Sequence, residues 1–415
     1  MSRPRVVITG FGAVTPIGVG LPAFCEGLRV GRCGVGPIQR FDASSYRSGV
    51  AAEVRDPVPV GTSESTGISR TERYGRCAHY SLAALAEALG GAGLARADLE
   101  GRRTALAFGG STAGMPEAEG DLLRLDDGDD YWDTASPAVF LGTPVGTTAD
   151  VLARACRLRG PVTTISTACS SATNALGQAS RWLMAGVADR VLAGGGDALC
   201  RLTHAGFNSL NLVAPERPLP FDARREGMCI GEGAAMFVLE REDTARARGA
   251  RIHARVLGFG NIAEAHHLVQ PREDGEGAAR AMMAALRDAG VPPERVDYVN
   301  AHGTATIQND LAEARGIHRV FGARASSLPT SSTKSQVGHL LGASGAVELA
   351  ACLLGMREGF LPPTAGFEVP DPEVDLDPVP GFARAGRIGV MLSNSFAFGG
   401  NDSSLCVAHP DTEAP

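Results

Sequence analysis

One cysteine stands where a strand-like run meets a helix-like run. Residues 163–166 read Thr-Thr-Ile-Ser, small residues flank Cys169, and a helical pattern follows over 171–188. Backbone N–H groups at a helix N-terminus favour thiolate over thiol, so this position suits a nucleophile that forms a covalent intermediate. A buried structural cysteine explains the segment equally well, although the small flanking residues leave room for a ligand near the sulfur.

Two histidines lie in comparable loops. His302 follows the apolar run 296–299 and precedes Gly303, and His339 comes five residues after Lys334. Loops at the carboxyl ends of strands are where α/β folds place reactive groups. A cation beside an imidazole disfavours a second positive charge, so we expect Lys334 to keep His339 neutral and able to donate one hydrogen bond. In isolation, His302 would be interpreted as a structural histidine and Lys334 as a solvated side chain.

A fourth segment, 394–402, reads Asn-Ser-Phe-Ala-Phe-Gly-Gly-Asn-Asp. Its two consecutive glycines allow a ligand to approach the backbone closely. One cysteine and two histidines in strand-end loops indicate an enzyme. A zinc site is the competing interpretation, but the three residues are far apart in sequence and form no close ligand pair, so we expect no metal.

The elements that must position these residues alternate between strand and helix. The sequence predicts strands at 6–9, 104–108, 161–166, 190–192 and 234–239, with helices at 80–89 and 171–188. A similar order begins again with strands at 253–257, 298–301 and 387–392, and with helices at 277–289 and 343–357. This alternation is typical of an α/β fold, and it predicts two α/β halves, over 1–250 and 251–415. The proline-rich stretch 361–380 is expected to be an extended loop.

Composition supports a globular α/β protein and excludes several other classes. The 415 residues include Gly 53 and Pro 25, are 44% hydrophobic and carry a net charge of −7, which disfavours disorder and a nucleic-acid-binding surface. The glycine excess predicts many tight turns. Nine dispersed cysteines without a C-x-x-C pair indicate reduced thiols and a cytoplasmic protein, and we expect no signal peptide or membrane span. The acidic stretch 117–133 lacks calcium-loop spacing and is interpreted as a solvated insertion.

With these motifs in view, the chain resembles the β-ketoacyl-acyl-carrier-protein synthases of the thiolase-like fold, and in particular the elongating type of bacterial fatty acid and type II polyketide synthesis. The resemblance runs nearly end to end. Its motifs are Arg5–Gly10, Thr15–Gly18, Thr167–Ser171, Pro220–Asp222, His302–Thr304, Asn309–Asp310, Lys334–His339 and Asn394–Phe396. It implies five αβαβα layers in two fused pseudo-symmetric halves, and a homodimer or a heterodimer with a ketosynthase-like subunit.

The resemblance also implies roles for individual residues. Cys169 would carry the acyl chain as a thioester, while His302 and His339 would stabilise the enolate formed when a malonyl thioester loses CO₂. Lys334 would orient His339 with support from Glu348, and Asp310 would support the loop. The oxyanion hole would come from the Cys169 and Phe398 N–H groups, with Phe398 as a gate. Thr304 and Thr306 would contact the phosphopantetheine arm of an acyl carrier protein, so no separate cofactor is expected.

Several positions depart from the usual family pattern near the substrate path. Met228 stands where a phenylalanine is usual, Val269 where a threonine is common, and Ala397 in place of a glycine. Asn401 and Asp402 replace Thr-Asn, and the polar Thr112 falls in the pocket-lining segment 109–114. These changes favour a specialised secondary-metabolic ketosynthase.

Two alternatives remain open at this point. A ketosynthase-like cyclase would use the same residues to close a ring within one bound chain, without decarboxylation. An inactive chain-length subunit would share the fold but lack the nucleophile, and Cys169 argues against it. We also expect carrier docking at the arginines near Pro220, namely Arg217, Arg224 and Arg225.

Overall fold

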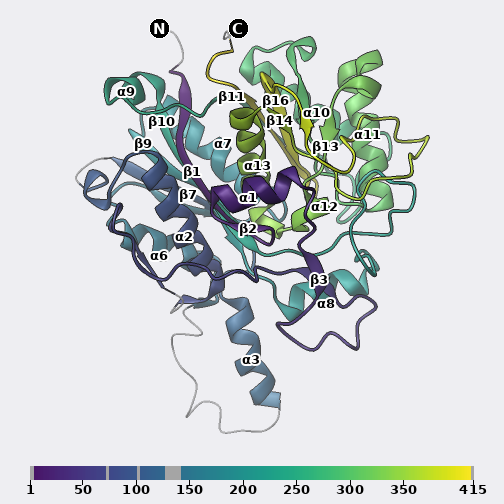
Figure 1. The fold of residues 1–415 in the computed structure, drawn as a ribbon, viewed down its shortest axis with the longest axis horizontal. Helices are drawn as coiled ribbons and strands as arrows, with labels where there is room; N and C mark the ends of the chain where they lie inside the picture. The colour runs from purple at the N-terminus through teal and green to yellow at the C-terminus, as the bar shows by residue number, and fades with distance from the viewer. Residues whose placement is uncertain (1–3, 72–73, 101–102, 127–141, 413–415) are drawn as a thin grey trace.

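The computed structural model describes residues 4–71, 74–100, 103–126 and 142–412 (Figure 1). Within these residues the main strands form one 11-stranded mixed sheet, in the order β13-β12-β16-β17-β11-β1-β10-β9-β7-β8, with the short β2 pairing with β1. Its strands are β1 (Val6–Thr15), β2 (Gly18–Val19), β7 (Thr104–Gly109), β8 (Val162–Ile165), β9 (Arg190–Asp197), β10 (Gly233–Arg241), β11 (Ala254–Ala263), β12 (Tyr298–Asn300), β13 (Thr330–Ser331), β16 (Val390–Ser395) and β17 (Asn401–Ala408).

The sheet consists of two halves with the same topology. In the first half, β1-β10-β9 are antiparallel neighbours, and β9-β7-β8 are parallel. In the second half, β11-β17-β16 repeat the antiparallel part, and β16-β12-β13 repeat the parallel part. The halves join where β1 pairs with β11 over Val6–Ile8. The repeat of element order therefore corresponds to a structural pseudo-symmetry.

Helices cover the two half-sheets on both sides (Figure 1). In the middle, α7 (Ser171–Met184) packs against α13 (Ser344–Glu358), and each contacts strands of both halves. Helices α2 (Arg76–Gly91) and α6 (Thr147–Ala155) cover the outer face of the first half, and α10 (Glu276–Ala289) covers that of the second, beside α11 (Ile307–Phe321). The result is the five-layer αβαβα arrangement that the family resemblance implied.

Glycine contributes to this packing as well as to turns. The strands predicted at 6–9 and 190–192 end too early, because β1 continues through Gly10 and Gly12 and β9 continues through Gly194. A Cβ at Gly10 would lie 2.1 Å from the Ala88 carbonyl oxygen, and one at Gly194 would lie 2.1 Å from the Ala235 oxygen. Part of the glycine excess therefore allows α2 and β10 to approach their neighbouring strands closely.

Shorter elements complete the described chain. They are β3 (Val35–Pro37), β4 (Val50–Ala52), β5 (Gly61–Thr62), β6 (Ser69–Arg70), β14 (Phe360–Leu361), β15 (Arg384–Ala385), α1 (Leu21–Arg29), α3 (Met115–Asp126), α8 (Arg201–Ser209), α9 (Glu242–Ala247) and α12 (Lys334–Val337), with 3-10 turns at Arg96–Asp98, Pro293–Arg295, Gly322–Ser327 and Leu341–Ala343. Helix α3 projects from the body (Figure 1) and begins the acidic stretch, of which 127–133 lie outside the described residues.

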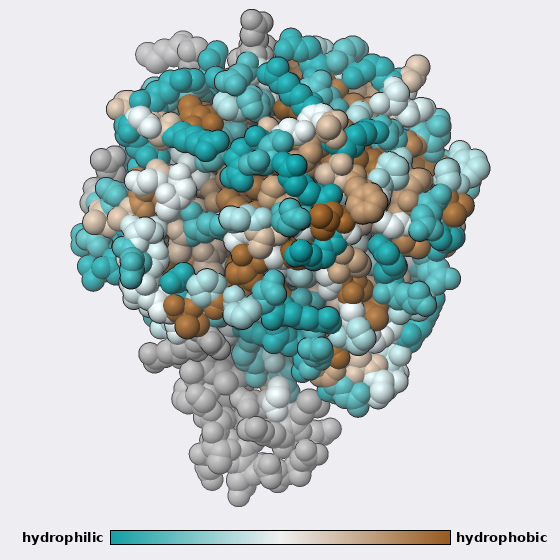
Figure 2. Space-filling model, viewed as in Figure 1, coloured by the Kyte–Doolittle hydropathy of each residue, from teal (hydrophilic) through white to brown (hydrophobic). Residues whose placement is uncertain are grey.

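The face shown in Figure 2 is mainly hydrophilic, with apolar side chains scattered in small groups. Among the described helices, none has the length and apolar character needed to cross a membrane.

Candidate active site

Cys169 sits in a tight turn between β8 and α7. Ala168, directly before it, has a φ of 51°, a conformation that residues with a Cβ rarely adopt. The Ser171 hydroxyl spans the turn, because it accepts the Thr167 N–H at 2.9 Å and donates to the Ala168 carbonyl at 2.6 Å. A strained residue and a side-chain clamp therefore hold the Cys169 thiol at the start of the helix.

Burial opposes ionisation of the Cys169 thiol. The residue is 7% exposed, and burial raises the pKa of its thiol to about 12. The Lys334 ammonium and the backbone N–H groups of Cys169 and Phe398 act in the opposite direction but do not outweigh desolvation. The expected effect of the helix N-terminus, which favours the thiolate, is therefore present but smaller than the effect of burial on this pKa.

His302 follows β12, and a buried carboxylate holds its backbone. The two oxygens of Glu313, on α11, accept the N–H groups of His302 and Gly303 at 2.8 Å each. Burial raises the pKa of Glu313 to about 7, although these N–H groups favour the ionised form. Sequence reasoning missed Glu313, because nothing in its spacing to His302 distinguishes it from an ordinary helical glutamate.

Lys334 contacts His302 rather than His339. Its Nζ lies 3.3 Å from His302 Nδ1, donates to the His302 carbonyl oxygen at 2.6 Å and forms an ion pair with Glu348. Lys334 and Glu348 are both 1% exposed. The expectation that Lys334 orients His339 is corrected, because α12 and Gly338, with a φ of 72°, turn the chain between the two residues.

His339 is held by neutral partners. Its Nδ1 lies 3.0 Å from the Leu341 backbone N–H and 3.0 Å from the Ser344 hydroxyl. A backbone N–H can only donate, so Nδ1 is the acceptor and the proton of the neutral ring is on Nε2. The Lys334 ammonium imposes the same tautomer on His302. Burial, followed by the charge of Lys334, lowers the pKa of both imidazoles well below 6.5.

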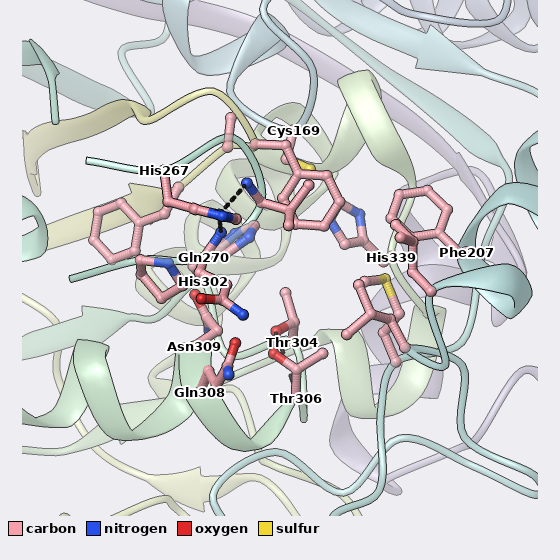
Figure 3. Close-up of a pocket in the computed structure, with 18 of the residues that line it drawn as sticks. Cys169, Phe207, His267, Gln270, His302, Thr304, Thr306, Gln308, Asn309 and His339 are labelled. Carbon is pink, nitrogen blue, oxygen red and sulfur yellow. Dashed lines mark hydrogen bonds between the residues drawn. The ribbon is translucent and has the colours of Figure 1, made fainter. Parts of the chain in front are cut away.

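The thiol and the two imidazoles converge at one point (Figure 3). The Cys169 sulfur and one nitrogen from each of His302 and His339 lie within 4.8 Å of one another, and the two rings meet edge-on at 87° with centroids 5.5 Å apart. The argument against zinc from sequence spacing therefore fails, because the fold brings these three distant residues together. The Lys334 ammonium 3.3 Å from His302 nevertheless opposes a second cation, so the set fits donation to an oxyanion better than metal ligation.

A cavity of about 520 Å³ leads to this cluster. Eight of the predicted site residues line it: Cys169, His302, His339, Phe398, Thr304, Thr306, Met228 and Val269. The Thr304 and Thr306 hydroxyls lie 2.9 Å apart, and the buried Asp310 supports their loop by accepting the Ala305 N–H at 3.2 Å. Lys334, Glu348 and Asp310 lie behind the cavity wall.

Thr112 does not line this cavity. It is 1% exposed, and its hydroxyl lies 2.8 Å from Asp197 Oδ1. Asp197, at the end of β9, also accepts the backbone N–H groups of Ser111, Thr112 and Gly342, which ties the loop after β7 to the residues after His339. Sequence reasoning missed Asp197, although its place at the end of a strand in the parallel part of the sheet was a usable signal.

The predicted docking arginines are largely engaged with acidic neighbours. Arg225 is 5% exposed and paired with Asp371 at 2.6 Å, so the docking prediction is wrong for this residue. The Arg224 side chain is 45% exposed but paired with Asp222 and Glu368. Instead, three exposed apolar side chains stand among the residues that line the cavity: Leu210, Leu268 and Ile307.

Comparison with known proteins agrees with this geometry. Residues 3–245 match the family model "Beta-ketoacyl synthase, N-terminal domain" and residues 253–368 match its C-terminal domain. The chain is 38% identical to a 3-oxoacyl-[acyl-carrier-protein] synthase 2 of Synechocystis sp., over 98% of both chains. It is 37% identical to the tetracenomycin polyketide synthase ketoacyl synthase alpha subunit of Streptomyces glaucescens, over 99% of this chain and 98% of the other.

Solved structures give the same result. The ishigamide ketosynthase/chain length factor superposes with a TM-score of 0.91 at 36% identity, covering 98% of this chain and all of the other. A type II polyketide ketosynthase in complex with its acyl-carrier protein, AntDE:AntF, gives a TM-score of 0.89 at 30% identity, covering 99% of this chain and all of the other. The chain therefore belongs to the β-ketoacyl synthase family, and it is an acyltransferase of the thiolase-like fold.

Proposed function

We propose that this enzyme lengthens a carrier-bound acyl chain by decarboxylative condensation, in three steps at the Cys169–His302–His339 cluster. The observation that carries the proposal is the shared geometry of one thiol and two imidazoles whose Nδ1 atoms are both occupied. Each ring is left with an Nε2–H donor, and neither can easily gain a positive charge.

In the first step the Cys169 sulfur attacks an acyl thioester. The tetrahedral oxyanion forms beside the Cys169 and Phe398 N–H groups, which already face the sulfur and favour negative charge there. The carrier thiol leaves and takes the proton that Cys169 loses. The products are an acyl-Cys169 thioester and a free carrier thiol, and this route needs no resting thiolate.

In the second step a malonyl thioester loses CO₂, and the electron pair of the broken C–C bond becomes an enolate. The Nε2–H groups of His302 and His339 donate to its oxygen, and removal of such a donor typically costs 10²–10³ in rate. In the third step the enolate carbon attacks the acyl-Cys169 carbonyl. The Cys169 thiolate leaves and takes up a proton, and a β-ketoacyl chain two carbons longer remains on the carrier.

The partners follow from the chemistry and from the relatives. We propose an acyl carrier protein that docks around the exposed Leu210, Leu268 and Ile307 at the cavity, with Val269 and the two threonines along its phosphopantetheine arm.

The edge strand β8, with Val162 40% exposed, is available for a second ketosynthase-like subunit. Secondary metabolism fits the several polyketide synthases among the relatives. Met228, which lines the cavity, remains a predicted substrate-contacting residue, whereas Thr112 is buried outside the cavity lining. A cytoplasmic location and the division at 250/251 also remain predictions.

Intact-protein mass spectrometry and CO₂ release test this function. Wild-type enzyme given acyl-carrier and malonyl-carrier protein should acylate at Cys169, release CO₂ and extend the chain by two carbons. Cys169→Ala should abolish the acyl-enzyme adduct and condensation. Consumption of a carrier-bound acyl substrate without use of malonyl thioester would contradict the proposal and support the ring-closing alternative, which no feature of the site favours. Intact pathway output with Cys169→Ala would indicate a non-catalytic subunit.

A further inference from the structure

Two buried carboxyl groups meet behind the Phe398 turn. Asp402 is 5% and Glu264 9% exposed, and both line the active-site cavity. A Cβ at Gly277 would lie 2.1 Å from Glu264 Oε1 and 2.8 Å from Asp402 Oδ2, so both carboxyl oxygens border the space that this glycine leaves open. Ionisation of both carboxyl groups in this buried space is unfavourable, because burial and a neighbouring negative charge each disfavour the ionised form.

The two carboxyl groups belong to segments that close on each other beside the cavity. The turn 396–402 carries Phe398, and the segment 264–272 carries Val269. Backbone hydrogen bonds join them, from Gly399 N–H to the Leu268 oxygen and from Glu264 N–H to the Gly400 oxygen, at 2.7 Å each. The side chains brace the same contact, because Asp402 Oδ1 accepts the Ala397 N–H at 3.3 Å and Glu264 Oε1 accepts the Arg272 N–H at 3.1 Å.

We propose that Asp402 and Glu264 share one proton, and that this proton holds the 396–402 turn closed against the 264–272 segment. The proton would lie on the side of Asp402 Oδ2, which borders the same space as Glu264 Oε1, leaving Asp402 Oδ1 to accept from Ala397. When the proton is lost, the two carboxylates repel and the turn loosens. The role assigned to this motion, admitting substrate past Phe398, rests on the proposed function, whereas the motion itself does not.

The charges around the pair are consistent with a shared proton. Burial, followed by the charge of Glu264, raises the pKa of Asp402 to about 7. Glu313 acts in the same direction, and Arg280 on α10 acts against it without cancelling the effect. The Arg272 guanidinium on the segment is already paired with Asp274 and Glu276 at 2.9 Å each.

The sign of the pH effect follows from linkage. The closed turn binds the proton with a pKa of about 7, and an opened, solvated aspartate binds it with a pKa of about 4. Closing therefore becomes about tenfold more favourable for each pH unit below about 7, down to about 4, and is independent of pH above 7. The turn should be closed in mild acid and looser at neutral and alkaline pH.

Hydrogen exchange of the 396–402 amides tests this directly. After correction for intrinsic exchange, wild-type protein should exchange there at least about tenfold faster at pH 7.5 than at pH 5.5. Asp402→Asn supplies a permanent N–H donor toward Glu264 while its oxygen still accepts from Ala397, so protection should be high and equal at both pH values. Glu264→Gln supplies the same donor from the other side and carries the test if Asp402→Asn does not fold.

The control is His267→Asn, which changes the titratable side chain whose Nδ1 accepts the Val269 and Gln270 N–H groups within the same segment. It should retain the wild-type pH dependence. Wild-type exchange that is independent of pH overturns the proposal, as does a folded Asp402→Asn or Glu264→Gln protein with the wild-type profile. Loss of the pH dependence in His267→Asn alone would assign the switch to the histidine and also overturn it. Because exchange needs no substrate, these outcomes are independent of whether the enzyme condenses acyl chains.

Discussion

The two histidines of the active site are held in the same tautomer by different partners. The His302 side relies on charge, because its Nδ1 faces the Lys334 ammonium, which is itself paired with the buried Glu348. The His339 side relies on neutral groups, the Leu341 N–H and the Ser344 hydroxyl. A buried ion pair fails severely when one partner is removed, whereas a bond shared between two neutral donors tolerates the loss of one. The two sides should therefore differ in their tolerance of mutation.

The largest effect is expected from breaking the charged side. Lys334→Met leaves the Glu348 carboxylate buried and unpaired, which should destabilise the fold by about 3–5 kcal/mol. It also removes the donor that fixes the His302 tautomer, so malonyl decarboxylation should fall at least about hundredfold. Urea unfolding and CO₂ release measure the two effects. In Lys334→Met/Glu348→Leu the stability should largely return while activity stays low, and a simultaneous return of activity would contradict the role of the charge.

Removal of either imidazole should be the next largest effect. His302→Ala and His339→Ala should each slow decarboxylation by about 10²–10³, because both donate to the same enolate oxygen. Transfer of the acyl chain to Cys169, which mass spectrometry measures, should be affected much less. The oxyanion of that step is stabilised by backbone N–H groups and not by the imidazoles. An equal loss in both half-reactions would show that these histidines do not act selectively on the enolate.

The pH dependence of decarboxylation should show the effect of Lys334 on His302. Both imidazoles have a pKa well below 6.5, so neither should become protonated as the pH falls from 8 to 6.5, and neither should cause an acid limb in that range. Lys334→Met removes a positive charge 3.3 Å from His302, which should raise the pKa of that ring and move its acid limb to higher pH. Nitrogen NMR of the two rings measures the shift. An unchanged His302 pKa in this variant would contradict the electrostatic explanation.

The smallest effect is expected on the neutral side. Ser344→Ala leaves the Leu341 N–H in place, so the His339 tautomer should persist and activity should fall less than about tenfold, the equivalent of one ordinary hydrogen bond. Steady-state kinetics with malonyl-carrier protein measures this loss. A loss as large as that of Lys334→Met would make the two sides equivalent.

The sequence predicted the fold and the strand-end positions of Cys169, His302 and His339, because these depend on local patterns and on family motifs. It could not predict which imidazole Lys334 contacts. Nearness in sequence suggested His339, but the short helix α12 and the turn at Gly338 direct the lysine toward His302, 32 residues away.

Burial could not be predicted from the sequence for Cys169 and Arg225, which are 7% and 5% exposed. The helix N-terminus predicts a lowered pKa for Cys169, yet desolvation has the larger effect on the pKa of this thiol. Arg225 was predicted to dock a carrier protein, but its ion pair with Asp371 forms only when distant segments fold together. Glu313 and Asp197 were missed for the same reason, since each binds backbone N–H groups of loops that tertiary structure brings to it.

The burial of Cys169 and the raised pKa of its thiol have a practical consequence for chemical labelling. Oxidants and alkylating reagents react with exposed thiolates, and a buried thiol with a raised pKa is a poor target for either. Of the nine cysteines, eight are buried and only Cys33 is partly exposed. A general thiol reagent applied to the resting enzyme should therefore modify Cys33 first, and substrate-like thioesters are the better choice for marking the nucleophile.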